Sequence, residues 1–303
     1  MKGALAAAAL LLTGAAQSPT ASVAPAAPAD KAAAKPAGLD PPAWTEPTAP
    51  FRIVGNVYYV GTRGLAAYLI RASDGRMVLI DGTMEENAPA IERSIAALGF
   101  RLSDVKLLLN SHAHFDHAAG LARLQRDTGA RLLASAGDAP ALRTGVPPSE
   151  VSYGVVRFPL VRVDGTLTDG RPVRLGDVAL VPAITPGHTP GCTTWSTTAV
   201  ERGRTLRVLF PCSLTVAGNR LVGNPGYPGI VADFRRSFAR MAAMDADAVL
   251  PAHPELTDVL GRAERAKAGD AGAWSMPGTI PAMVASARTA FDAALAKEQA
   301  ARR

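Results

Sequence analysis

The sequence has few of the residues that would mark a nucleic-acid-binding or membrane protein. Aromatic residues make up 5% of its 303 residues and are dispersed, which excludes a platform on which bases stack. The formal charge of +6 comes from scattered Lys and Arg residues with no run of like charges, so we expect no nucleic-acid partner. No apolar stretch reaches the roughly 20 residues of a transmembrane helix. The apolar content of 48% is enough for a sizeable core.

The N-terminus predicts export. Lys2 precedes an apolar run over residues 3–12, and small residues follow up to Ala16, which is the layout of a signal peptide over residues 1–16. The run is too short for a membrane anchor and holds no cysteine for a lipid, so we expect a periplasmic or secreted product without membrane association after cleavage. Residues 17–50 are rich in Ala and Pro and predict a flexible segment, which leaves residues 51–303 as the folded domain.

Cysteine is scarce. Cys192 and Cys212 are the only two in the sequence. In an exported chain an even pair favours a disulfide. Two buried free thiols, or Cys212 as a metal ligand, are the alternatives.

From Arg52 onwards, short β-type runs alternate with turns and helical segments. Asn87 stands where it can cap a helix that has Pro89 in its first turn. We expect strands at residues 53–60, 65–71, 77–81, 105–110, 173–175, 178–184, 193–198, 206–210 and 248–250, and helices at residues 87–99, 118–128, 231–244 and 283–303. Strands followed by helices, twice over, indicate an α/β fold and favour two sheets face to face with helices outside, although other α/β layouts share this pattern.

The five histidines all lie at strand ends or in loops. Three of them and Asp116 stand within residues 112–117, directly after the nearly all-apolar run at 105–110, while His188 and His253 lie in Pro-containing turns. Burying that many polar groups without a partner costs several kcal/mol, and a metal ion supplies a partner. Imidazole and carboxylate ligands suit zinc, with iron and manganese as weaker alternatives.

The spacing within residues 112–117 predicts two adjacent metal positions. His112 and His114 are two residues apart and project to the same side of a turn that leaves a strand. Asp116 and His117 lie beyond the bend and face a neighbouring point. Three protein ligands per metal leave room for water, which is the pattern of a catalytic site.

The hexapeptide resembles the H-x-H-x-D-H signature of the metallo-β-lactamase superfamily. Residues 79–82, 186–191 and 251–254 resemble its other strand-end motifs. The resemblance as a whole spans roughly Pro47 to Trp274. It implies a four-layer αβ/βα sandwich with the metal site at the edge between the sheets. It also implies two zinc ions per chain, the first held by His112, His114 and His188 and the second by Asp116, His117 and His253.

Within the superfamily, the sequence is most similar to the third β-lactamase subclass. Residues 211–215 lack the metal-bridging Asp of many non-lactamase members, and His117 stands where the commonest lactamase subclass has Arg. Residues 187–195 and 223–228 also resemble the third subclass. The resemblance implies that a metal-bound hydroxide hydrolyses the amide bond of β-lactam antibiotics, a small-molecule substrate, and so confers resistance. A thioester or lactone hydrolase is the alternative within the fold, and a catalytically idle zinc protein is the alternative outside enzymes.

The resemblance also implies roles around the metals. Asp116 is expected to position the hydroxide. Ser213 and Thr215 are expected to bind the substrate carboxylate, the alternative being ordinary strand-end polarity, and Asn219 is a further candidate for substrate contact. Asp81 is expected to support the site from behind. Cys212 is one residue from the cysteine ligand of the commonest subclass and points to the other strand face, so we favour its disulfide with Cys192.

Overall fold

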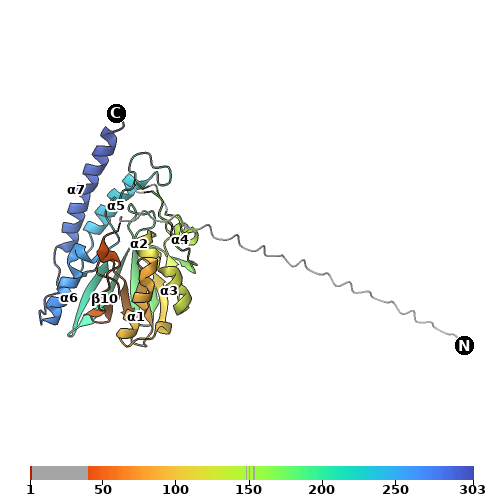
Figure 1. Cartoon of the computed structure of the whole chain (residues 1–303), viewed down its shortest axis with the longest axis vertical. Coiled ribbons are helices and arrows are strands. Elements are labelled where there is room, and N and C mark those ends of the chain that lie inside the picture. The colour runs from red at the N-terminus through yellow and green to blue at the C-terminus, as the bar shows by residue number, and fades with distance from the viewer. Residues whose placement is uncertain (2–39, 148, 150, 153) are drawn as a thin grey trace. The chain divides into compact units, whose positions relative to one another are not determined.

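The computed structural model describes Met1 and residues 40–303 apart from residues 148, 150 and 153 (Figure 1). The expected signal peptide at residues 1–16 and the first part of the expected flexible segment, up to residue 39, fall on residues that are not described apart from Met1. Within the described part, none of the helices is both long enough and apolar enough to span a bilayer.

The domain consists of twelve strands, seven α-helices and four 3-10 helices among the described residues. The strands are β1 (Phe51–Val54), β2 (Val57–Tyr59), β3 (Tyr68–Arg71), β4 (Met77–Ile80), β5 (Val105–Leu109), β6 (Arg131–Ala134), β7 (Gly165–Thr166), β8 (Val173–Leu175), β9 (Val178–Ile184), β10 (Thr193–Glu201), β11 (Arg204–Phe210) and β12 (Ala248–Val249). The helices are η1 (Pro42–Trp44), η2 (Glu85–Asn87), α1 (Ala88–Ala97), η3 (Leu102–Asp104), α2 (Phe115–Ala118), α3 (Leu121–Thr128), α4 (Ala139–Thr144), α5 (Ile230–Ala242), η4 (Pro254–Thr257), α6 (Val259–Lys267) and α7 (Thr279–Ala300).

Two mixed sheets form the centre of the domain. The first has the order β1-β2-β3-β4-β5-β6-β7 and the second the order β12-β11-β10-β9-β8. Strands β4 to β7 run parallel to one another in the first sheet. Because the carboxyl ends of parallel strands meet at one edge of a sheet, the residues that follow β4, β5 and β6 are brought together there.

The alternation of side chains along the strands produces the layers. In β4, Val78 and Ile80 face the core between the two sheets, whereas Met77 and Leu79 face the core under α1 and α3. A third core, which includes Phe234 of α5, joins α5 and α7 to the second sheet. Figure 1 shows α1 and α3 on one side of the strands and α5 and α7 on the other. The expected four-layer αβ/βα sandwich is confirmed.

Local structure differs from the sequence-based expectation in several places. Residues 53–60 form a β1–β2 hairpin and not one strand, because Gly55 adopts φ +51° and reverses the chain. Asn87 precedes α1 but makes no capping hydrogen bond, because its backbone is already helical; its side-chain amide donates to the Trp44 carbonyl at 2.9 Å. The helix expected at residues 118–128 is divided between α2 and α3. The expectation missed β6, β7, α4 and α6.

The last residues of the expected flexible segment, which runs to residue 50, pack against the domain. Pro42–Trp44 form η1, and the Trp44 carbonyl accepts a hydrogen bond from the Thr62 hydroxyl at 2.9 Å. The Gly64 amide donates to the Ala43 carbonyl at 2.7 Å. The end of the Ala/Pro-rich segment is therefore fixed to the domain by backbone groups, which an analysis of composition does not detect.

Candidate metal centre

The five histidines and Asp116 gather at the edge where the strands of both sheets end. His112 and His114 lie in the loop after β5, and Asp116 and His117 lie in α2. His188 comes from the loop between β9 and β10, and His253 from the turn after β12. The loop after β5 is held to the second sheet by Trp195, whose indole nitrogen donates to the Asn110 carbonyl at 3.1 Å.

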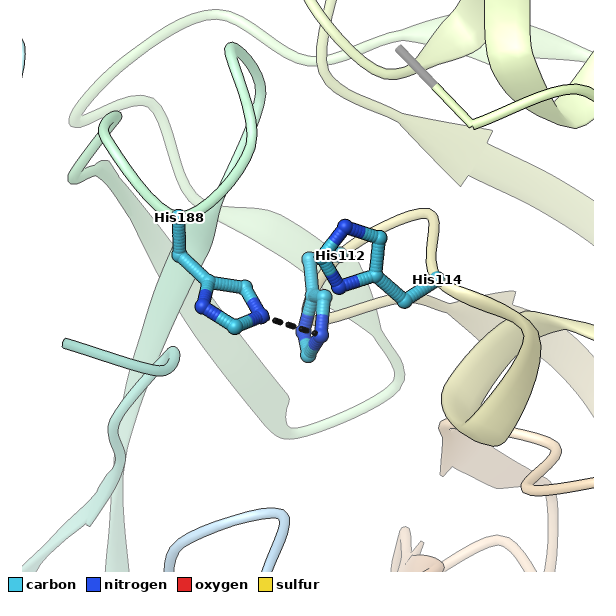
Figure 2. A group of neighbouring side chains, drawn as sticks. All are labelled: His112, His114 and His188. Carbon is cyan, nitrogen blue, oxygen red and sulfur yellow. Dashed lines mark hydrogen bonds between the residues drawn. The ribbon is translucent and has the colours of Figure 1, made fainter. Parts of the chain in front are cut away.

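His112, His114 and His188 form the first group of side chains. All three are buried, and each offers a donor atom within 4.8 Å of those of the other two. Figure 2 shows the three rings turned toward one another, with the Nε2 atoms of His188 and His112 3.1 Å apart. This is the arrangement of three ligands around a common point.

Asp116, His117 and His253 form the second group. Oδ2 of Asp116 lies 3.0 Å from Nε2 of His117 and 3.5 Å from Nε2 of His253, and the two Nε2 atoms are 3.2 Å apart. His112 also lies with Asp116 and His117 inside a 4.8 Å cluster of donor atoms. The two groups are therefore neighbours, as the spacing of the hexapeptide predicts.

The imidazoles of the first group are in the neutral state that a metal ligand needs. Burial, reinforced by the neighbouring imidazoles, holds the pKa of His112 and of His188 well below 6.5. Burial lowers the pKa of His114 to about 4. Nδ1 of His188 donates to the Thr215 carbonyl at 2.7 Å. A neutral His188 thus carries its proton on Nδ1, and Nε2 presents a lone pair to His112.

The second group contains a permanent negative charge. Burial alone would raise the pKa of Asp116, but His117 and His253 hold it well below 3.8, so the carboxylate stays ionised. Burial opposes protonation of His117, but Asp116 raises its pKa above 6.5. A divalent cation bound here would take the place of the proton on His117, and the converging nitrogen atoms and one buried carboxylate are a donor set that suits such an ion. The residues present therefore fit the zinc ions that the sequence implies.

Asp81 stabilises this edge through buried hydrogen bonds, as expected from the sequence. It follows β4 and is buried, and its Oδ1 accepts hydrogen bonds from the Ser111 amide at 2.7 Å and the Asn110 side chain at 3.0 Å. Its Oδ2 lies 3.8 Å from Nδ1 of His117. Asp81 thus fixes the start of the loop that carries His112.

The two cysteines form a disulfide. Cys192 and Cys212 are joined with their Cα atoms 5.8 Å apart. The bond connects the loop of His188 to the segment that follows β11, and a disulfide sulfur is not available as a thiolate ligand.

In the segment that follows β11, the Ser213 and Thr215 hydroxyls face the same side and lie 3.0 Å apart. Thr215 is exposed and Ser213 half-buried.

Asn219, a candidate for substrate contact, lies beneath the His188 loop. It is buried, and its amide nitrogen donates to the His188 carbonyl at 3.1 Å and to the Val216 carbonyl at 2.8 Å. Its amide oxygen accepts a hydrogen bond from the Ser149 hydroxyl. These partners let Asn219 support the His188 loop, and its contact with a substrate stays a prediction.

Sequence reasoning missed two residues near the cluster. The Trp44 ring lies 5.5 Å from the His253 ring and 6.2 Å from the Phe115 ring, measured between centroids. Asp138 lies after β6 and bonds to both of the loops that carry the three histidines of the first group. The position of Asp138 after a parallel strand next to β5 is a signal that could have found it.

Comparison with known proteins agrees with the site. The family model described as the metallo-beta-lactamase superfamily matches residues 60–253. The chain is similar to BJP-1, a subclass B3 metallo-β-lactamase of Bradyrhizobium japonicum, with 41% identity and a TM-score of 0.81 over 86% of this chain and 99% of that chain.

Curated relatives with a different name match over shorter stretches. The chain is 33% identical over 126 residues to a hydroxyacylglutathione hydrolase of Fuscovulum blasticum, which covers 41% of this chain and 40% of that protein. It is 30% identical over 194 residues to a hydroxyacylglutathione hydrolase of Acidiphilium cryptum, covering 63% of this chain and 64% of that protein. The chain thus spans less than two thirds of the length of either relative.

Proposed function

The chain belongs to the metallo-β-lactamase superfamily, and on that premise we propose that it is a β-lactamase that holds two zinc ions. One observation supports the choice of a β-lactam as the substrate. The segment 211–215 presents the Ser213 and Thr215 hydroxyls beside His188 and contains no carboxylate. A pair of hydroxyls next to the cluster suits an anionic substrate, and β-lactam antibiotics carry a carboxylate.

The similarity to BJP-1 supports this proposal, because it extends over 99% of that chain. The alternative is a thioester or lactone hydrolase. The similarity to hydroxyacylglutathione hydrolases, which extends over shorter stretches, supports this alternative. An acid that bridges two metals after β11 would favour this alternative, and the segment that follows β11 has none. The β-lactamase is therefore the better supported function.

The proposed zinc positions follow the two groups of side chains. His112, His114 and His188 hold the first ion, and Asp116, His117 and His253 the second. When bound, zinc lowers the pKa of a coordinated water to near 7 and polarises the carbonyl oxygen of a substrate.

The chain's own residues then orient the reactants. The ionised Asp116 carboxylate accepts a hydrogen bond from the attacking water and holds it against the lactam carbonyl carbon. The Ser213 and Thr215 hydroxyls donate to the substrate carboxylate and fix the lactam ring on that side of the site. No side chain forms an acyl intermediate, because water is the nucleophile.

Export is part of the proposal. Residues 1–16 act as a signal peptide, and the mature protein works in the periplasm or outside the cell. The Cys192–Cys212 disulfide supports this location, since disulfides persist mainly in oxidising compartments.

Replacing Ser213 by Ala tests the substrate-binding role. We expect Ser213→Ala to keep two zinc ions per chain and to raise KM for a β-lactam. A hydrogen bond to a charged group is worth about 1.5 to 3 kcal/mol, which corresponds to roughly a tenfold to hundredfold change. Metal analysis and steady-state kinetics measure the two quantities.

The matched control is Ser73→Ala, in the exposed β3–β4 turn at the opposite edge of the first sheet, which should leave KM unchanged. Loss of one zinc from Ser213→Ala would contradict the ligand assignment. An unchanged KM would contradict the contact with the substrate carboxylate.

A further inference from the structure

Asp138 is a buried carboxylate outside the six proposed ligands. Its side chain is the acceptor for three hydrogen bonds within the described residues. Oδ2 accepts from the Ala113 amide at 2.9 Å and from the Thr189 hydroxyl at 2.8 Å, and Oδ1 accepts from the Gly191 amide at 2.8 Å. Only 2% of Asp138 is exposed, so these partners take the place of water.

The donors belong to the two loops that carry the first group of histidines. Ala113 lies between His112 and His114, and Thr189 follows His188. One carboxylate oxygen thus joins the backbone of the first loop to a side chain of the second. The His188 loop is also held by the Ser135 hydroxyl, which donates to the Gly191 carbonyl at 2.7 Å. Both contacts come from the segment that follows β6.

A carboxylate suits this position better than its neutral analogues. Burial raises the pKa of Asp138 to about 6, although the hydrogen bonds from Thr189, Ala113 and Gly191 lower it. Both oxygens of the side chain act as acceptors. An asparagine of the same shape has one acceptor atom and one donor atom, so one of the two loops would face an N–H group instead of an oxygen.

We propose that Asp138 is a positioning residue that sets the spacing of the His112–His114 loop and the His188 loop, and with it the affinity of the first zinc position. This inference rests on the proposed function in one respect, namely that these three imidazoles bind zinc. Asp138 acts through the loops and touches neither the metal nor the substrate. Partners that orient metal ligands affect affinity by about 10- to 100-fold.

The experiment measures zinc affinity and not only activity. Apoprotein of the full chain and of its variants is titrated with zinc in competition with a coloured chelator, and with cobalt(II) to record the absorption spectrum. We expect Asp138→Asn to bind the first zinc about 10- to 100-fold more weakly and to change the cobalt spectrum. Asp177→Asn is the control, because Asp177 also accepts a backbone hydrogen bond, from Ser73 at 2.9 Å, but it lies in the turn between β8 and β9.

A second pair of variants keeps the test independent of the folding of Asp138→Asn. Thr189→Val removes the hydroxyl that donates to Asp138, whereas Thr189→Ser retains it. We expect weaker binding of the first zinc in Thr189→Val and near wild-type affinity in Thr189→Ser. Equal zinc affinities in the wild type, Asp138→Asn and Thr189→Val would overturn the inference.

The outcomes separate this inference from the proposed function. A wild-type chain that binds no zinc would overturn both. Weaker zinc binding by Asp138→Asn in a chain that hydrolyses a thioester and no β-lactam would support the role of Asp138 and overturn only the proposed substrate.

Discussion

Exhaustive chelation of the purified chain is expected to abolish β-lactam hydrolysis, and added zinc is expected to restore it. In the proposed mechanism no serine or cysteine acts as the nucleophile, so catalysis depends on water activated by the metal. Metal activation is worth several kcal/mol, which corresponds to a loss of roughly a thousandfold or more in rate. Hydrolysis rates before chelation, after chelation and after zinc addition, with metal content measured in parallel, provide the test.

A serine-directed acylating inhibitor is the control for this experiment and should leave the rate unchanged. Full activity in protein whose metal content has been shown to be negligible would exclude the zinc mechanism. Inhibition by the acylating reagent would indicate a covalent enzyme instead.

Asp116→Asn is expected to have the largest effect among single substitutions at the site. The change removes the negative charge at Oδ2, which lies 3.0 Å from His117 and 3.5 Å from His253, and so weakens the second metal position. It also removes the acceptor that orients the water. Because substitution of residues that only support ligands costs about 10- to 100-fold, loss of this ligand should reduce kcat/KM by at least about 100-fold.

Metal analysis should show one zinc per chain in Asp116→Asn. The matched control is Asp104→Asn, where the carboxylate pairs with Arg101 on the surface and no metal ligand is near in the chain. Two zinc ions per chain together with kcat/KM within tenfold of the wild type would remove Asp116 from the ligand set.

Local patterns in the sequence were sufficient to predict an α/β fold and the gathering of the histidines, whereas the four-layer arrangement followed from the resemblance to a known family. Apolar runs such as residues 105–109 belong to strands covered on both faces, and their ends mark the edge where polar residues meet. The dense hexapeptide after β5 then identifies the site. The pairing of the cysteines also followed from their number and the expected export.

The residues that position the ligands could not be predicted in this way, because their partners are distant in the sequence. Asp138 bonds to Thr189 and Gly191, which are 51 and 53 residues away. The bond from Asn219 to the His188 carbonyl joins residues 31 apart and depends on the path of the loop after β11. Trp44 lies in a segment whose composition alone indicates a flexible chain. Side-chain hydrogen bonds between loops require the three-dimensional structure.

The central claim is that this zinc site acts on β-lactams, and a comparison of substrates tests it most directly. The mature, zinc-loaded chain is assayed with a penicillin, a carbapenem and a glutathione thioester under identical conditions, with and without chelator. The account predicts chelator-sensitive hydrolysis of at least one β-lactam with a kcat/KM well above that for the thioester. Efficient thioester hydrolysis with no measurable turnover of either β-lactam would contradict it.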